Sequence, residues 1–207
     1  MGLPRVFLLS PAHCGGERAQ LLFSPRANFD LARRLRGEEG ATLGEVFSFL
    51  SGLYFRGKLA YANTFGLPLV ITTNAGLRPA DDRVTLETLR LAARVDIKAG
   101  NPRYRRPLLA SAKTVAEWVG PEGAVTLLGS IASDKYVDVL LGVFGERLTF
   151  PAEFVGRGDM SRGGLLLRHA RSGVELDYLP LRGATRRGAR PPRLLPVPRV
   201  THRASPC

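Results

Sequence analysis

The sequence contains few cysteines and histidines, the residues on which disulfide frameworks and most zinc sites depend. Two cysteines (Cys14 and Cys207) and three histidines (His13, His169 and His202) occur among 207 residues. Two cysteines are too few for the disulfide framework of a small secreted domain. The histidines are scattered, without metal-ligand spacing between them and the cysteines. We therefore expect neither a metal nor a cofactor.

Long apolar runs are also missing. No apolar segment approaches the roughly 20 residues that a membrane-spanning helix needs. The first ten residues, MGLPRVFLLS, are apolar but interrupted too early for a secretory signal, and they fit a buried strand instead. We therefore expect a cytoplasmic protein without a membrane partner.

What the sequence does contain is typical of a globular domain followed by a basic tail. Hydrophobic residues make up 44% of the chain and charged residues 23%. The net charge is +12, and segment 182–207 holds seven of the 30 Lys and Arg residues but no acidic residue. We predict a single domain over 1–181 and, because 182–207 is rich in Pro and Arg, a disordered tail that attracts phosphates.

Apolar runs of strand length alternate with segments of helical spacing. The predicted strands are 5–10, 69–73, 125–132, 148–155 and 174–181. The predicted helices are 17–23, 29–36, 42–65, 84–95, 108–119, 135–144 and 165–171. This alternation is typical of an α/β domain. We predict a three-layer αβα sandwich around a mostly parallel sheet of four or five strands.

Local signals refine this prediction. Thr42 and Glu45 have the spacing of a capping box at the start of the predicted helix 42–65. Ser51–Gly52 should interrupt this helix. Ser133–Asp134 is suited to cap the helix at 135–144. Pro151 cannot donate to a strand ladder, so it favours an edge position or a bulge for its strand.

Polar loops follow the predicted strands, where open α/β sheets bind their ligands. Glycines let the backbone approach a ligand, serine hydroxyls and N–H groups suit phosphate oxygens, and arginines add charge-assisted hydrogen bonds. The candidate ligand- or phosphate-binding residues are Ser10, Cys14, Arg18, Asn74, Gly129, Ser130, Ser133, Gly156, Arg157, Gly158, Ser161 and Arg162. Loop 156–164 is the strongest candidate, because it alone combines glycines, two arginines and an acid.

Three residues are candidates for proton transfer in an enzyme. They are Asp159, His13 and Glu17, which lie in or next to the same loops. The sequence contains no Walker loop and no GxGxxG segment in a dinucleotide-binding context. Spacing alone also identifies no set of nucleophile, base and orienting group.

Four segments together carry a resemblance to a known type of domain. They are LYFRGKLAYA at 53–62, LVITTNAGLRPADD at 69–82, VTLLGSIASDKY at 125–136 and GRGDMS at 156–161. Their order and spacing resemble a bacterial and phage family of α/β domains, which is similar to the uracil-DNA glycosylase-like module of some deazaguanine-modification enzymes. The resemblance spans about 5–170 and implies a Rossmann-like sandwich with a base- or nucleotide-binding edge.

The chain departs from the glycosylase pattern in both loops that such enzymes use. Their first loop carries an acidic or amide residue that activates water, whereas here Glu17 is the only acid beside Ser10, His13 and Cys14. Their late loop carries a His-Pro-Ser type of segment, which 157–161 does not match.

Three functions follow as hypotheses. The first is binding of DNA, RNA or a nucleotide through the Gly/Ser/Arg loops. The second is an enzyme of base or nucleoside chemistry, with cleavage of an N-glycosidic bond as the reaction. The third is a non-catalytic adaptor that acts through the basic tail at 182–207.

Overall fold

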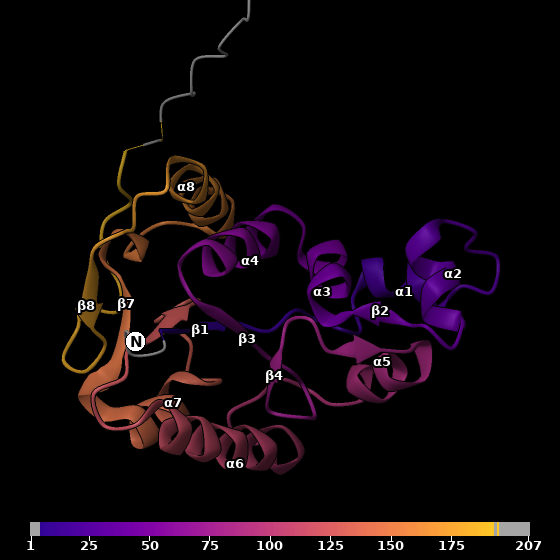
Figure 1. Ribbon diagram of the computed structural model, residues 1–207, viewed down its shortest axis with the longest axis horizontal. Coiled ribbons are helices and arrows are strands. Elements are labelled where there is room, and N and C mark those ends of the chain that lie inside the picture. The colour runs from indigo at the N-terminus through magenta and orange to yellow at the C-terminus, as the bar shows by residue number, and fades with distance from the viewer. Residues whose placement is uncertain (1–4, 193, 195–207) are drawn as a thin grey trace, which may run out of the picture.

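The computed structural model describes residues 5–192 and 194, and its centre is a six-stranded, mostly parallel sheet (Figure 1). The four central strands are parallel, and each edge strand runs antiparallel to its neighbour. Across the sheet the strands are β4 (Leu77–Pro79), β3 (Leu67–Ile71), β1 (Val6–Leu9), β6 (Val125–Leu128), β7 (Leu148–Pro151) and β8 (Tyr178–Pro180).

Helices flank the sheet on both sides. The α-helices are α1 (Glu17–Phe23), α2 (Asp30–Arg36), α3 (Leu43–Ser51), α4 (Leu53–Phe65), α5 (Leu86–Ala93), α6 (Pro102–Val119), α7 (Val137–Phe144) and α8 (Asp159–Ser172). Figure 1 shows α4 and α8 on one side of the sheet and α6 and α7 on the other. The short strands β2 (Ala41–Thr42) and β5 (Arg83–Val84) pair beside α1, α2, α3 and α5 at one end of the molecule.

The strands at the centre of the sheet form the core. Every residue of β1 is fully buried, as is every residue of β6 to within 1%. Both strands pair on each edge and are covered by helices on each face, so every side chain of a strand meets protein. This explains why their sequences are continuous apolar runs rather than alternating patterns.

Helices α4 and α8 pack closely because glycines lie where they cross. A Cβ on Gly57 would lie 2.6 Å from the carbonyl oxygen of Gly163. A Cβ on Gly163 would lie 2.9 Å from the carbonyl oxygen of Leu53. Only residues without a side chain fit this crossing, so loop 156–164 continues directly into a structural contact.

The predicted α/β fold with a mostly parallel sheet is confirmed, but the number of strands is not. The sheet has six strands rather than four or five. The additional strand is β4, whose residues were expected to lie in loops. Leu77 pairs with Ile71 of β3 after a five-residue reversal at Thr72–Gly76, and the three residues of β4 are too few for a recognisable apolar pattern.

Two local predictions are confirmed. Thr42 and Glu45 form a capping box, in which the Glu45 amide donates to Thr42 Oγ1 at 3.2 Å and the Thr42 amide donates to Glu45 Oε2 at 2.9 Å. The helix then ends at Ser51, and Gly52 separates α3 from α4 with a φ of 63°. This left-handed conformation is one that glycine adopts without strain.

Two other local predictions are wrong. Ser133–Asp134 does not cap α7, which begins three residues later, after Tyr136, without a side-chain cap. Ser133 Oγ instead accepts a hydrogen bond from the Lys135 amide at 3.3 Å. Pro151 does not lie in an edge strand, because β7 is between β6 and β8. It is the last residue of β7, where it pairs with Tyr178 of β8, and it lies beyond the residues that pair with β6, so its missing N–H removes no hydrogen bond from the ladder with β6.

The described part of segment 182–207 lies against the domain. Arg182 pairs with Glu146 at 2.9 Å and Arg186 with Asp138 at 3.5 Å. Leu194 packs against the hydrophobic core. The prediction of disorder for 193 and 195–207 falls on residues outside the described part.

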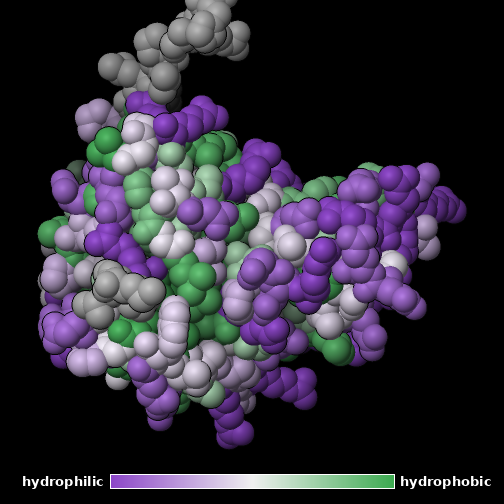
Figure 2. All heavy atoms as spheres, viewed as in Figure 1, coloured by the Kyte–Doolittle hydropathy of each residue, from purple (hydrophilic) through white to green (hydrophobic). Residues whose placement is uncertain are grey.

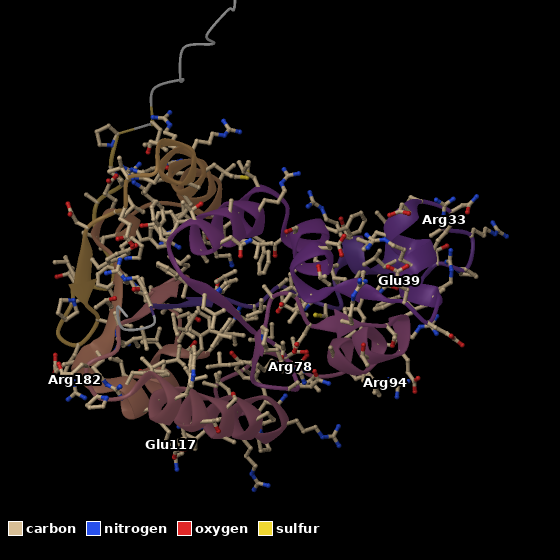
Figure 3. All side chains as sticks on the ribbon, in the orientation of Figure 1. Arg33, Glu39, Arg78, Arg94, Glu117 and Arg182 are labelled. Carbon is tan, nitrogen blue, oxygen red and sulfur yellow. The ribbon has the colours of Figure 1, made fainter. Side chains whose placement is uncertain are left out.

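The surface is charged, and none of the described helices is long and apolar enough to cross a membrane. Figure 2 shows hydrophilic residues crowded over the end that holds α1, α2 and β2, with more apolar residues around the sheet. Figure 3 labels six charged residues, spread from the end that holds α1 and α2 to the side of β8: Arg33, Glu39, Arg78, Arg94, Glu117 and Arg182.

Candidate functional site

The candidate site is a cleft at the carboxyl ends of β1 and β6. The chain passes from β1 to β3 on one side of it and later returns to β6 on the other side. The loops that leave β1 and β6 therefore diverge, which is the topological switch point where open α/β sheets bind ligands. Ser10 follows β1 directly, and Gly129 and Ser130 follow β6.

We call this site the β1–β6 cleft. It has a volume of about 490 Å³. Its lining combines hydroxyl, amine and carboxylate groups with a few apolar surfaces. The lining residues are Ser10, Pro11, His13, Tyr54, Asp96, Ile97, Lys98, Ser130, Ser133, Lys135, Tyr136 and Asp159.

Lys58 of α4 lies at the inner end of this cleft, against Ser10. Its side chain is 1% exposed, and Nζ donates to the carbonyl oxygen of Ser10 at 2.8 Å and to Ser10 Oγ at 2.9 Å. The amine also lies 4.5 Å from the ring centroid of Tyr54 and 4.8 Å from that of Phe55. A lysine so completely buried is rare, because an ammonium group loses its hydration there.

Burial lowers the pKa of Lys58 to about 7. The negative charge of Asp159 acts in the opposite direction and raises this pKa, while the positive charge of Arg162 lowers it further. A large fraction of the Lys58 side chains is therefore neutral at physiological pH. A neutral amine has a lone pair and can accept a proton.

Tyr54 contributes a second unusual polar group. The residue lines the cleft and is 8% exposed, and its hydroxyl is buried without a hydrogen-bond partner among the described residues. Burial raises the pKa of this hydroxyl, so it remains protonated at neutral pH. Buried polar groups without a partner are few in folded proteins.

Gly129 allows the loops after β1 and β6 to approach each other. A Cβ at this position would lie 2.7 Å from Ser10 Cβ and 2.9 Å from the Tyr136 hydroxyl oxygen. That hydroxyl donates to the carbonyl oxygen of Ser130 at 3.1 Å, which fixes the turn between β6 and α7. The glycine therefore keeps Ser10 and Ser130 on the same cleft.

The charged side chains that line the cleft are two aspartates, Asp96 and Asp159, and two lysines, Lys98 and Lys135, so their formal charges balance. Asp96 pairs with Lys98 at 2.8 Å, and Asp159 lies 3.6 Å from an Arg162 nitrogen. Both carboxylates therefore have a cationic neighbour. Lys135 is exposed and forms no ion pair with the described residues, so it is available to an anion.

The structure brings together some of the residues predicted from sequence. Five of them line the β1–β6 cleft: Ser10, His13, Ser130, Ser133 and Asp159. Gly129 contacts the same group of residues. Segments more than a hundred residues apart in the sequence thus meet at one edge of the sheet, as the predicted order of strands implied.

Other candidates lie outside this cleft on the β1 side. The Cys14 thiol is buried beside the Ala12 carbonyl, and burial raises its pKa to about 12. Arg18 donates to the Phe49 carbonyl at 3.2 Å, and Glu17 is exposed in the first turn of α1. Asn74 lines a separate cavity of about 280 Å³ beyond β3.

The arginines of loop 156–164 also do not line the cleft. Arg162 is 8% exposed, and its guanidinium donates twice to the Phe154 carbonyl, at 3.0 and 3.2 Å. Arg157 binds the carbonyl and the carboxylate of Glu153 at 2.9 and 3.2 Å. It borders a second, shallow pocket that also contains Gly158 and Ser161.

Gly156 has a structural role beside this pocket. Its φ is 72°, and a Cβ there would lie 2.0 Å from the carbonyl oxygen of Ala189. Gly156 therefore admits the chain that follows β8 rather than a ligand.

Four residues at the site were not predicted from the sequence: Lys58, Tyr54, Lys98 and Lys135. For Lys58 a signal was available. It lies four residues after Tyr54 and three before Tyr61, all on the buried face of α4. A lysine within an otherwise apolar helical stripe indicates a buried amine with a specific partner.

Comparison with known proteins adds no assignment, because no protein-family model, curated protein or solved structure matches the chain.

Proposed function

We propose that the β1–β6 cleft binds a nucleotide or a closely related phosphorylated small molecule. The observation that carries this proposal is the position of a cleft of about 490 Å³ at the topological switch point of the sheet. Hydroxyls and a free cation border the cleft there. Its volume is within the roughly 300–1,000 Å³ that is usual for small-ligand sites.

The turn between β6 and α7 supports phosphate binding. Ser130, Ser133 and Lys135 all line the cleft from this one turn. Serine hydroxyls can donate to phosphate oxygens, and the Lys135 ammonium adds a charge-assisted hydrogen bond. The ion pairs of Asp96 and Asp159 reduce the repulsion that these carboxylates would exert on an anion.

The remaining walls suit a base or a sugar. Pro11, Ile97 and the rings of Tyr54 and Tyr136 provide apolar surface. Aromatic and apolar groups that converge with a few polar groups are typical of small-molecule sites. A single nucleotide fits this description better than a nucleic-acid strand, because the arginines of loop 156–164 are engaged elsewhere.

The finer fold assignment belongs to the same proposal. We infer a Rossmann-like arrangement related to the uracil-DNA glycosylase-like domains. The central position of β1 and the cleft at its carboxyl end support this inference. A ligand edge at this place is what the resemblance in sequence implies.

Hydrolysis of an N-glycosidic bond is a second candidate function. Asp159 and His13, two of the residues predicted to transfer protons, line the same cleft. A carboxylate there can orient or deprotonate a water molecule. Release of free base from a panel of nucleosides and uracil-containing DNA, lost in Asp159→Ala, would support this reaction, and absence of turnover across the panel would contradict it.

Binding is tested by titrating the protein with nucleoside mono- and diphosphates of the common bases in a calorimeter, and with the unphosphorylated nucleosides. We expect saturable binding of the phosphorylated compounds only. Lys135→Ala should weaken it about tenfold, equivalent to 1.4 kcal/mol for one charge-assisted contact.

The matched control is Lys113→Ala. Lys113 is exposed on α6 and does not line the cleft, so its loss removes the same charge without touching the site. Equal weakening by both variants would show that binding depends on overall charge alone. Absence of binding to every phosphorylated compound would also contradict the proposal.

A further inference from the structure

We propose that Ser10 is a nucleophile and Lys58 its general base, and that the pair hydrolyses a carboxylic ester bound in the β1–β6 cleft. The proposal goes beyond nucleotide binding, because it rests on the Ser10–Lys58 pair at the inner end of the cleft. A serine paired with a lysine is one of the known nucleophile–base arrangements of acyl transfer.

The geometry of the pair is that of an activated nucleophile. Lys58 Nζ lies 2.9 Å from Ser10 Oγ, within the range for proton transfer. A second hydrogen bond, 2.8 Å long, joins Nζ to the Ser10 carbonyl oxygen and holds the amine in place. Ser10 lines the cleft, whereas Lys58 is 1% exposed behind it, so a substrate reaches the serine and water is kept from the amine.

The hydrogen bonds are compatible with a neutral lysine. A neutral amine can donate one proton to the Ser10 carbonyl oxygen and accept the Ser10 hydroxyl proton with its lone pair. The Ser10 oxygen then becomes more nucleophilic, because the O–H bond is polarised toward the amine. Both hydrogen bonds of the Lys58 amine go to Ser10, to its carbonyl oxygen at 2.8 Å and to its hydroxyl oxygen at 2.9 Å.

Charged and titratable groups approach Lys58 from two elements, α4 and α8. Tyr54 faces it from α4 itself, and Asp159 and Arg162 act on it from α8. Tyr136, which precedes α7, lies close to Ser10. The opposite charges of Asp159 and Arg162 partly cancel, so desolvation is the main cause of the lowered pKa of Lys58.

The reaction conserves atoms and protons. Ser10 Oγ attacks the carbonyl carbon while its proton passes to Lys58 Nζ. The ester C–O bond then breaks, and the ammonium group returns the proton to the departing alcohol. Water attacks the acyl-serine, gives one proton to Lys58, and the carboxylic acid leaves as Ser10 Oγ recovers that proton.

Hydroxyl groups in the cleft can stabilise the oxyanion that forms in both steps. Ser130 and Ser133 line the cleft beside Ser10. Ser133 Oγ accepts a hydrogen bond from the Lys135 amide, which leaves its own proton free to donate. Such hydroxyl donors are among the groups that form oxyanion holes.

The first experiment is covalent labelling of the full chain with a fluorophosphonate, followed by mass spectrometry of its peptides. Ser10 Oγ should displace fluoride from phosphorus and carry the adduct. Ser10→Ala should abolish labelling, whereas Ser172→Ala, which removes an exposed hydroxyl at the end of α8, should leave the rate unchanged. An adduct on another serine, or none, would overturn the proposal.

The role of Lys58 is tested in Lys58→Met, which retains the length of the side chain without the amine. Labelling should slow by about 10²–10⁴-fold, the usual contribution of a general base. Lys113→Met is the control for loss of a lysine. If Lys58→Met does not fold, the pH dependence of wild-type labelling tests the role of Lys58 instead. The labelling rate should rise with pH around a midpoint near 7. A rate that is flat from pH 6 to 9 would contradict a lysine base.

The substrate class is tested with p-nitrophenyl acetate and p-nitrophenyl phosphate. We expect turnover of the acetate with an acetylated Ser10 intermediate. Labelling of Ser10 together with turnover of the phosphate alone would overturn the ester assignment. Protection of Ser10 by a nucleotide would link this chemistry to the proposed ligand, while labelling without any nucleotide binding would contradict the proposed function and leave the Ser10–Lys58 pair in place.

Discussion

The two glycine- and serine-bearing loops that follow β6 and β7 look alike in sequence but differ in the structure. Loop 129–136 borders the cleft, and its Ser130, Ser133 and Lys135 face the site. Segment 156–164 carries the two arginines, yet both donate to carbonyl groups of the domain, and Asp159 is its one residue that lines the cleft. The difference shows that composition alone does not separate a ligand loop from a structural one.

The reason lies in what each loop meets. Only 156–158 of the predicted loop is a loop, because 159–164 forms the start of α8, which packs on α4; Gly156 lies against the chain that follows β8. Gly156 and Gly163 are needed for close backbone contacts, and Arg157 and Arg162 donate to carbonyl groups. Loop 129–136 lies at the switch point of the sheet and borders the cleft there.

The largest effect on stability should come from the crossing of α4 and α8. In Gly163→Ala, the new Cβ would lie 2.9 Å from backbone atoms of Leu53 and Tyr54, which cannot move without shifting α4. We expect a loss of about 3 kcal/mol in the free energy of unfolding, measured by chemical denaturation.

Gly164→Ala is the matched control for this crossing. The nearest atom to a Cβ at Gly164 is Leu194 Cδ1 at 3.9 Å, an ordinary contact. Alanine should therefore be neutral or stabilise α8 by up to about 1 kcal/mol. Equal destabilisation by both variants would show that the crossing is not the cause.

The second effect concerns Lys58 and the dependence of stability on pH. Its folded-state pKa is about 7, against 10.5 in the unfolded chain. Below pH 7 both states bind the proton, and the full cost of burying the ammonium remains. Between pH 7 and 10.5 only the unfolded state binds it, so stability should rise with pH by a few kcal/mol, on the order of 1.4 kcal/mol per unit.

This prediction is checked by denaturation of the wild type and Lys58→Met at pH 6, 7, 8 and 9. The difference between the two should change above pH 7 in favour of the wild type. A constant difference across this range would mean that Lys58 is charged in the folded protein at all of these pH values.

The third effect concerns Gly129, where a loss of function should exceed the loss of stability. The Cβ of Gly129→Ala would meet Ser10 Cβ and the Tyr136 hydroxyl, which belong to side chains that can shift. We expect about 1–2 kcal/mol of destabilisation. Calorimetry should show that nucleotide binding is lost in the folded variant. Unchanged binding would place the ligand elsewhere.

Much of the fold could be predicted because its signals are local. The apolar run of β1 and the mostly apolar run of β6 indicate central strands, and Thr42 with Glu45 forms the capping box that their spacing predicts. The strand β4 could not be found, because three residues hold no period. The edge strand predicted from Pro151 was wrong, because an inner strand tolerates a proline at a position where the neighbouring strand has stopped pairing.

The site was predictable only in part, because local signals do not show which polar groups already bind other parts of the domain. Ser10, Ser130 and Asp159 could be placed by their positions after strands or before a helix. Which polar groups are already engaged depends on tertiary contacts: Arg162 is occupied by the Phe154 carbonyl, and Lys58 is directed to Ser10. Spacing along the chain contains no record of these partners.

The smallest effect on the proposed site should come from Arg157→Ala. Arg157 contacts Glu153, Ser161 and the Pro192 carbonyl, all outside the β1–β6 cleft. We expect a loss of about 1 kcal/mol or less in stability. Ligand affinity should be unchanged, because the lost cation does not border the site.

The most direct measurement of the central claim is therefore a calorimetric titration of one nucleoside diphosphate into wild type, Lys135→Ala and Arg157→Ala under the same conditions. If the nucleotide binds in the β1–β6 cleft, Lys135→Ala should weaken binding about tenfold and Arg157→Ala should bind as the wild type does. Loss of binding in Arg157→Ala with full affinity in Lys135→Ala would place the ligand at loop 156–164 and contradict the account.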